Sequence, residues 1–151
     1  FGDGQLTSCK PISDRDLARF IVDSLNAPKR QGAILPIGGP GPAITPLEQG
    51  HALFEALGQP CRFRHVPVAF LDLIIGGLRV AGVFSAKARD TLELARIGRY
   101  YATQSMLVYN PETGRYCPDM TDEFGKDTLL QFYRDLAAGQ AKIDLGTHSV
   151  F

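Results

Sequence analysis

The residues that could do chemistry in this chain are few and widely spaced. The three histidines, His51, His65 and His148, are isolated from one another. His51 and Glu55 lie four positions apart and would share a helix face, but two ligands are half of a metal site at best, and a solvated pair explains the spacing better. No serine or cysteine lies in a nucleophile motif such as GxSxG. The sequence therefore predicts no metal site and no self-sufficient catalytic constellation, and it leaves the catalytic and cofactor-binding residues unassigned.

The glycine-rich segment 38–44 (GGPGPAI) deserves a test as a dinucleotide-binding loop, since it follows an apolar run and precedes a helix. The third glycine of the fingerprint is absent, and Pro40 and Pro42 lack N–H groups that would hold a pyrophosphate. No acidic residue ends a second strand about 20 positions later, as the fingerprint also requires. The Tyr–Lys pair common in short-chain reductases, four positions apart, is missing too. We therefore predict a structural turn here.

The strand–turn–helix unit at residues 34–58 is the element on which we expect the rest of the chain to pack. Residues 34–37 (ILPI) predict the end of a buried strand. Thr45 and Glu48 have the spacing of a capping box at the start of a helix, and Gly58 is a typical residue for its end. Together these signals predict an α/β unit.

Apolar periodicity and turn residues predict the remaining elements. In chain order these are helix Asp14–Leu25 capped by Ser13, a surface loop at 26–32, a short strand at 61–66, helices at 68–84, 88–101 and 127–138, and a hairpin of strands at 105–109 and 115–117. Asp14 and Asp16 place negative charge at the positive end of the first helix dipole. We expect the first helix to pack on its apolar side and the last helix to bury Leu129, Phe132, Tyr133 and Leu136.

Residues 68–84 (VAFLDLIIGGLRVAGVF) form the most apolar stretch, with Asp72 and Arg79 as its charged residues. A membrane-spanning helix needs about 20 apolar residues with few charges. We favour a helix of a soluble protein with a wide apolar face. That face could belong to the core, line a pocket for a large flat ligand, or meet a partner or a membrane surface.

The overall composition suits one domain or one lobe of a larger protein. Of 151 residues, 44% are hydrophobic, and 16 basic residues balance 16 acidic ones, so no charge field indicates nucleic acid. Three cysteines without a CxxC motif favour a reducing compartment over a disulfide framework. Because the chain begins at Phe1 in the middle of a pattern, we expect a piece of a longer protein.

Several short motifs resemble those of a known family. Residues 1–4 (FGDG), 9–13 (CKPIS) and 16–18 (DLA) are similar to extended and atypical short-chain dehydrogenase/reductases. More specific are residues 35–41 (LPIGGPG), 45–50 (TPLEQG), 97–102 (IGRYYA), 105–107 (SML), 112–116 (ETGRY) and 125–129 (GKDTL). In this order they resemble the C-terminal part of the 3,8-divinyl (proto)chlorophyllide 8-vinyl reductases, from residue 1 to about residue 139.

The resemblance implies an α/β fold: the substrate-side portion of a Rossmann-like, NmrA-like reductase, mostly helical with a few strands and a small β-hairpin. Residues 1–139 would form the substrate-binding part and residues 140–151 a tail. The implied reaction reduces the 8-vinyl group of a magnesium tetrapyrrole, divinyl chlorophyllide or protochlorophyllide, to ethyl. NADPH would be bound mainly by an N-terminal half that this chain lacks, which puts activity of the chain alone in doubt.

The resemblance also suggests substrate-binding residues. Arg99 could pair with the propionate carboxylate of the pigment, with Lys10 as a second candidate. Tyr100 and Tyr101 could stack on the ring or offer a phenolic proton, and Phe70 belongs to the apolar wall. A surface charge is the alternative for Arg99 and Lys10, and half-buried packing is the alternative for the tyrosines.

Two other functions stay open. One is a non-catalytic, NmrA-like module that senses a dinucleotide or docks a partner. The other is a membrane-associated interaction domain that uses residues 68–84. For the reductase we expect a cytoplasmic location, with peripheral association to photosynthetic membranes in bacteria, or the chloroplast in plants. The oligomeric state is not predicted.

Overall fold

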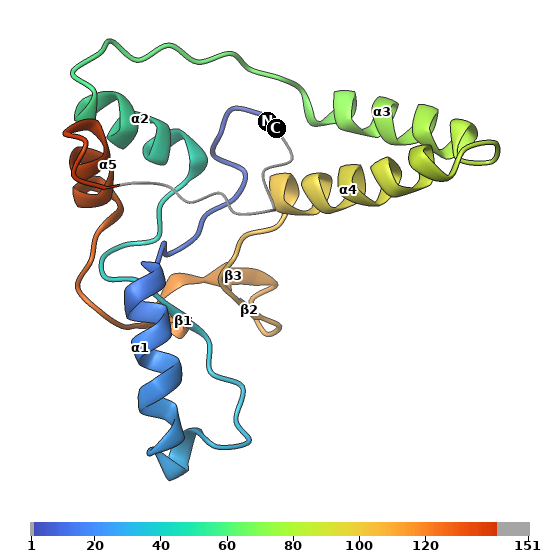
Figure 1. The fold of residues 1–151 in the computed structure, drawn as a ribbon. Coiled ribbons are helices and arrows are strands. Elements are labelled where there is room, and N and C mark those ends of the chain that lie inside the picture. Colours follow the sequence, from blue (N-terminus) through green and yellow to red (C-terminus); the bar gives the residue numbers. More distant parts are fainter. Residues whose placement is uncertain (1, 142–151) are drawn as a thin grey trace.

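The computed structural model describes residues 2–141, and these form a mostly helical α/β fold (Figure 1). The helices are α1 (Asp14–Leu25), α2 (Pro46–Ala56), α3 (Val68–Ala81), α4 (Ala86–Thr103) and α5 (Leu129–Ala137), with short 3-10 turns η1 (Pro28–Arg30) and η2 (Pro118–Met120). The strands are β1 (Ile37–Gly38), β2 (Val108–Asn110), β3 (Arg115–Cys117) and β4 (Asp122–Glu123). The predicted mixture of many helices, few strands and a small hairpin is confirmed. Most of the predicted tail at 140–151 lies outside the described residues.

The strands form two separate pairs. β1 lies parallel to β4, with Ile37 opposite Asp122. β2 and β3 form the predicted antiparallel hairpin, with Tyr109 opposite Tyr116. The first hairpin strand begins at Val108, later than the predicted start, because the preceding residues pair with a different segment.

That segment runs through Cys9 and joins three parts of the chain. Cys9 and Ile44 exchange backbone hydrogen bonds of 3.0 and 2.8 Å, and the N–H of Met106 donates to the carbonyl of Ser8 at 2.9 Å. The N-terminal segment is therefore held between the loop before α2 and the chain that leaves α4.

The predicted helix caps are confirmed at α1 and α2. The Ser13 hydroxyl accepts from the N–H of Asp16 at 3.0 Å. Thr45 and Glu48 form the reciprocal capping box, in which the Glu48 carboxylate accepts from the Thr45 N–H at 2.7 Å. Gly58 follows the end of α2 with a φ of +61°, the left-handed conformation expected at such an end.

Two predicted strands are wrong. Residues 34–37 contribute only Ile37 to β1, and Ile34 is 97% exposed, so this is no buried strand. Pro36 lacks the N–H that a ladder needs, and β4 offers just two residues for pairing. Residues 61–66 form no strand either: only Val66 is paired, through a single bridge to Gly2.

The predicted burial of two helix faces is also wrong. On the apolar side of α1, Phe20 is half-buried against Phe124, but Leu17, Ile21 and Leu25 are exposed, Leu25 to 72%. α5 begins at Leu129 rather than Asp127, because Thr128 caps it, and its Phe132 is exposed while the other three predicted positions are half-buried. Within the described residues α5 packs on α2, and no large element covers α1.

α3 and α4 form an antiparallel helical hairpin, which we call the arm. Figure 1 shows the arm extending to one side of the other elements, joined to α2 by a long extended stretch. Leu71 and Leu92 are the buried apolar side chains of the described residues, and both lie on the arm. α3 ends at Ala81, three residues earlier than predicted, because the chain turns at 82–84 before Ser85 caps α4. Within residues 2–141, no helix has the length and hydropathy of a membrane span.

Candidate functional site

Four of the five predicted substrate-binding residues lie at the base of the arm: Phe70 on α3, and Arg99, Tyr100 and Tyr101 on α4. The Nε of Arg99 on α4 donates to the Oδ1 of Asp72 on α3 at 2.5 Å. Since the helices are antiparallel, this ion pair sets Phe70, near the start of α3, level with Tyr100 and Tyr101, near the end of α4. The hydrogen bond to Asp72 also raises the pKa of the Arg99 guanidinium.

The aromatic side chains at this base are available for contact with a ligand. The rings of Tyr100 and Tyr101 meet edge to face, with centroids 5.8 Å apart. Both tyrosines and Phe70 are more than half exposed. Exposed flat rings can stack on an aromatic ligand, and a guanidinium can hold a carboxylate.

Lys10 lies apart from this group. Its side chain is 7% exposed, and its ammonium donates to the Thr121 carbonyl at 3.1 Å and to Glu123 Oε1 at 3.2 Å. Glu123 also accepts from the N–H of Gly41, and this bond first, then Lys10, lowers the pKa of its carboxyl. A substrate carboxylate would have to compete with Glu123 for this ammonium.

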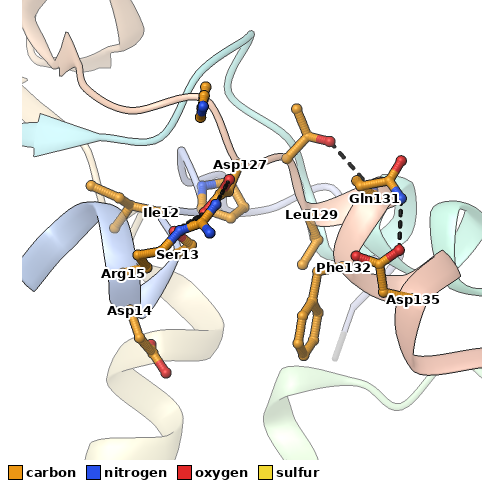
Figure 2. A pocket seen from close by; sticks show the side chains of 12 residues that line it. Ile12, Ser13, Asp14, Arg15, Asp127, Leu129, Gln131, Phe132 and Asp135 are labelled. Atoms are coloured by element: carbon orange, nitrogen blue, oxygen red, sulfur yellow. Dashed lines mark hydrogen bonds and ion pairs between the residues drawn. The ribbon is translucent and has the colours of Figure 1, made fainter. Parts of the chain in front are cut away.

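A cavity of about 470 Å³ lies between the N-terminal ends of α1 and α5. It is lined by residues 11–15 and by residues 126–129, 131, 132 and 135. Figure 2 shows Ser13, Arg15 and Asp127 together on one side, with Leu129 and Phe132 on the other. The volume is in the range of small-molecule pockets. None of the predicted site residues lines it, so sequence reasoning missed this cavity; its one sequence signal is a pair of capping residues, Ser13 and Thr128.

Two of the charged side chains that line this cavity, Arg15 and Asp127, pair with each other. Asp127 accepts from Arg15 Nη2 at 2.6 Å and from the Ser13 hydroxyl at 2.9 Å, and the Arg15 contact lowers the pKa of Asp127. Asp16, which is 1% exposed, accepts from the backbone N–H groups of Asp127 at 3.0 Å and Lys126 at 2.9 Å. These two bonds lower the pKa of Asp16. The network holds α1 to the loop before α5, and this structural role accounts for its buried carboxylate.

The glycine-rich loop does not fit a pyrophosphate. A Cβ on Gly38 would stand 2.3 Å from Lys10 Cβ, and one on Gly39 would stand 1.8 Å from the carbonyl oxygen of Pro11. The glycines therefore let two backbone segments approach closely. The N–H of Gly41 is taken by the carboxylate of Glu123, at 3.2 Å, so an acidic group occupies the place where a phosphate would have to bind.

The side chains of His51 and Glu55 contact different residues. His51 Nδ1 lies 3.2 Å from the Cys61 sulfur, whereas Glu55 Oε1 accepts from Arg134 on α5 at 2.8 Å. No group of three or more potential metal ligands occurs in the part of the chain that the structure describes. The pair is therefore explained by packing contacts between α2 and its neighbours.

Comparison with known proteins gives consistent matches along the chain. The divinyl chlorophyllide a 8-vinyl-reductase of Cucumis sativus, a chloroplastic protein, is 49% identical over 152 residues, covering 100% of this chain and 36% of the relative. The protein of the same name from Oryza sativa subsp. indica is 47% identical, over 100% of this chain and 38% of its own. That of Arabidopsis thaliana is 46% identical over 147 residues, covering 97% and 35%.

No family model matches the chain, and no solved structure matches it significantly. The chain spans little more than a third of the length of the relatives it matches. Because identity near one half extends over the whole chain, the resemblance inferred from its motifs is confirmed. The chain is homologous to plant divinyl chlorophyllide a 8-vinyl-reductases over about a third of their length.

Proposed function

We propose that this chain is the substrate-binding part of a reductase that converts the 8-vinyl group of divinyl chlorophyllide or protochlorophyllide to ethyl. The observation that carries the proposal is the identity of 46–49% over essentially the whole chain to proteins named for that reaction. The matched region covers 97–100% of this chain, so it includes the loops and the exposed arm as well as the central elements. It therefore supports a shared role as well as a shared fold.

The full-length protein in this proposal has the Rossmann-like architecture of an atypical short-chain reductase. The strands of the described residues form only two-stranded pairs, and the glycine-rich loop does not fit a pyrophosphate. NADPH, which supplies hydride when bound, is accordingly assigned to the remainder of the full-length polypeptide. Residues 1–139 then contribute the pigment-holding surface.

At the base of the arm, each predicted residue has a role consistent with its geometry. A guanidinium has five N–H donors, and Asp72 takes the one on Nε, which leaves the terminal nitrogens of Arg99 for a carboxylate. The ion pair fixes the direction of this fork. Tyr100, Tyr101 and Phe70 offer exposed rings on which a macrocycle can stack.

The assay that tests the proposal uses the full-length protein with NADPH and divinyl chlorophyllide under anaerobic conditions. The product is followed by absorbance and separated from the substrate by chromatography. We expect monovinyl pigment that increases with time and requires both protein and NADPH. A dinucleotide-sensing or partner-docking module, which is the alternative function, would bind NADPH and leave the pigment unchanged.

The role of Arg99 is tested by comparison with a matched residue on the same helix. Arg96 is one turn away and also forms an exposed ion pair, with Glu93 at 2.6 Å. We expect Arg99→Ala to raise KM for divinyl chlorophyllide roughly tenfold or more with a smaller change in kcat, the loss typical of a charge-assisted hydrogen bond. Arg96→Ala should leave both constants close to those of the wild type.

The methyl ester of the pigment separates a binding role from a structural one. The ester lacks the carboxylate, so the difference in KM between the wild type and Arg99→Ala should vanish with it. Asp72→Ala breaks the same ion pair while keeping the guanidinium, and it should cost less than Arg99→Ala. An Arg99→Ala defect that is equal for acid and ester would remove the carboxylate role and leave the reductase assignment intact.

A further inference from the structure

We propose that the tip of the arm, residues 79–89, docks on an anionic lipid surface. The tip is the turn between α3 and α4 with the last residues of α3 and the first of α4. Figure 1 places this turn at the end of the arm farthest from the other elements. The inference rests on the exposure and charge of the tip and is independent of the substrate proposed above.

The apolar side chains of the tip are among the most exposed of the described residues. Val80 is 68% exposed, Val83 74% and Phe84 88%. Val83 and Phe84 occupy the turn itself, where no other element of residues 2–141 covers them. Together, the aromatic side chain and the two β-branched side chains of the tip form a small apolar patch that can insert into a lipid interface.

The charges around this patch are all positive. Residues 79–89 contain Arg79, Lys87 and Arg89 and no acid, in a chain whose charges balance overall; the first acid beyond them is Asp90. All three basic side chains are exposed. The Arg89 side chain lies against the turn, since its Cγ is 3.1 Å from where a Cβ on Gly82 would stand. Exposed cations within a few residues of exposed apolar side chains are the complement of a bilayer with anionic headgroups.

The shape of the tip favours a lipid surface over a protein partner. A stable protein interface buries about 800 Å² on each side, usually around a packed pocket. A single convex turn with three apolar side chains is too small for this, whereas a headgroup layer accepts a small wedge and diffuse charge. With α3 extending 14 residues, or about 20 Å, docking at the tip would hold the base of the arm close to the membrane.

The test is flotation of the full-length protein with vesicles of phosphatidylcholine alone or with 30% phosphatidylglycerol. We expect roughly tenfold stronger association with the anionic vesicles, weakened by 0.5 M salt. The double substitution V83S/F84S should lower association about tenfold, and R79Q/K87Q should remove the preference for anionic lipid. Leu73→Ser, at an exposed apolar position on the shaft of the arm, is the matched control and should bind like the wild type.

Two outcomes would overturn the proposal. One is equal vesicle association of the wild type and V83S/F84S. The other is that the wild type does not associate with the vesicles and that V83S/F84S lowers the apparent Tm or the oligomer size. In that case the rest of the polypeptide or a protein partner would cover the tip. The vesicle readout needs neither NADPH nor pigment, so its failure is distinct from failure of the reductase assay.

Discussion

Gly39→Ala tests whether the glycine loop exists for close backbone packing. A Cβ at this position would stand 1.8 Å from the carbonyl oxygen of Pro11, and contacts under 3.0 Å are essentially never seen for real Cβ atoms. The two segments would therefore have to separate by at least about 1.2 Å, the difference between these distances. The clash is with backbone, so no side-chain rotation relieves it.

The expected cost follows from what this separation breaks. Overpacking of this kind costs about 1–3 kcal/mol. The bond from the Gly39 N–H to the Lys10 carbonyl, 3.2 Å long, would be lost at about 1 kcal/mol more. A loss of about 2–4 kcal/mol should lower the apparent Tm of the full-length protein by roughly 3–6 °C in a thermal melt.

Gly77→Ala is the matched control, because it makes the same chemical change inside α3. Nothing lies within 4 Å of a Cβ at Gly77, so the added methyl meets open space. There the substitution should stabilise by about 0.5–1 kcal/mol through helix propensity, opposite in sign to Gly39→Ala. A Gly39→Ala protein that melts like the wild type would refute the close approach of residues 10–12 to this loop.

Three further predictions concern single contacts. Asp16→Asn should lower the Tm at pH 7, and the difference from the wild type should shrink as the pH falls below the ordinary carboxyl value of 3.8. The reason is that the pKa of Asp16 is lower in the folded than in the unfolded protein. The charged carboxylate therefore stabilises the folded state at pH values above its unfolded pKa, and this stabilisation is lost as the pH falls and the carboxylate takes up a proton. Thermal melts between pH 7 and pH 3 check this. Thr45→Ala removes one half of the capping box and should cost about 1 kcal/mol in a denaturant titration, whereas Thr45→Ser should cost little. Iodoacetamide should alkylate the exposed Cys61 before Cys9, because burial raises the pKa of the Cys9 thiol. Peptide mass spectrometry at successive times measures the alkylated fraction of each cysteine, and faster reaction at Cys9 would contradict the structure.

The features that the sequence predicts well depend on neighbours along the chain. A capping box needs residues three apart, so Thr45 and Glu48 could be recognised directly. Ser13 at the start of α1 and the hairpin of β2 and β3 are equally local signals. Each of these was confirmed, because the interaction closes within a few residues and needs no partner from elsewhere.

Burial could not be predicted in the same way. The periodicity of Leu17, Ile21 and Leu25 shows which side of α1 is apolar, but it says nothing of what covers that side. In the structure these side chains are exposed. The cavity was missed for a related reason, since its walls are more than 100 positions apart in the sequence and meet only through the fold.

The arm shows how far site prediction could go. The resemblance implies a flat pigment with one carboxylate, which suggests Arg99, Tyr100 and Tyr101 as ligands and Phe70 as part of the apolar wall. Their similar height along the arm follows from the pairing of α3 with α4, which includes the ion pair of Arg99 with Asp72, a contact over 27 positions that no spacing rule predicts. That these residues bind a pigment stays a prediction, and the KM comparison of Arg99→Ala with Arg96→Ala tests it.

The motifs that carry the family resemblance can be given a physical reason in the fold. Gly125, in the GKDTL motif, has a φ of +89°, and a Cβ there would stand 2.1 Å from the Asp16 carboxylate of the DLA motif. The chain can wrap Asp16 only because this residue is glycine. Gly38 and Gly39 of the LPIGGPG motif make the same kind of close approach to the CKPIS segment.

These motifs therefore specify how three distant segments fit together. Such contacts tolerate little change in any protein that keeps this fold, whatever its reaction, because a methyl group at one glycine already forces backbone apart. The motif IGRYYA is different: its Arg99 and tyrosines lie on an exposed helix end, where packing alone demands much less. Exposed rings and a guanidinium can contact a ligand, so substitutions at the arm base are the first to test against the proposed pigment-binding role.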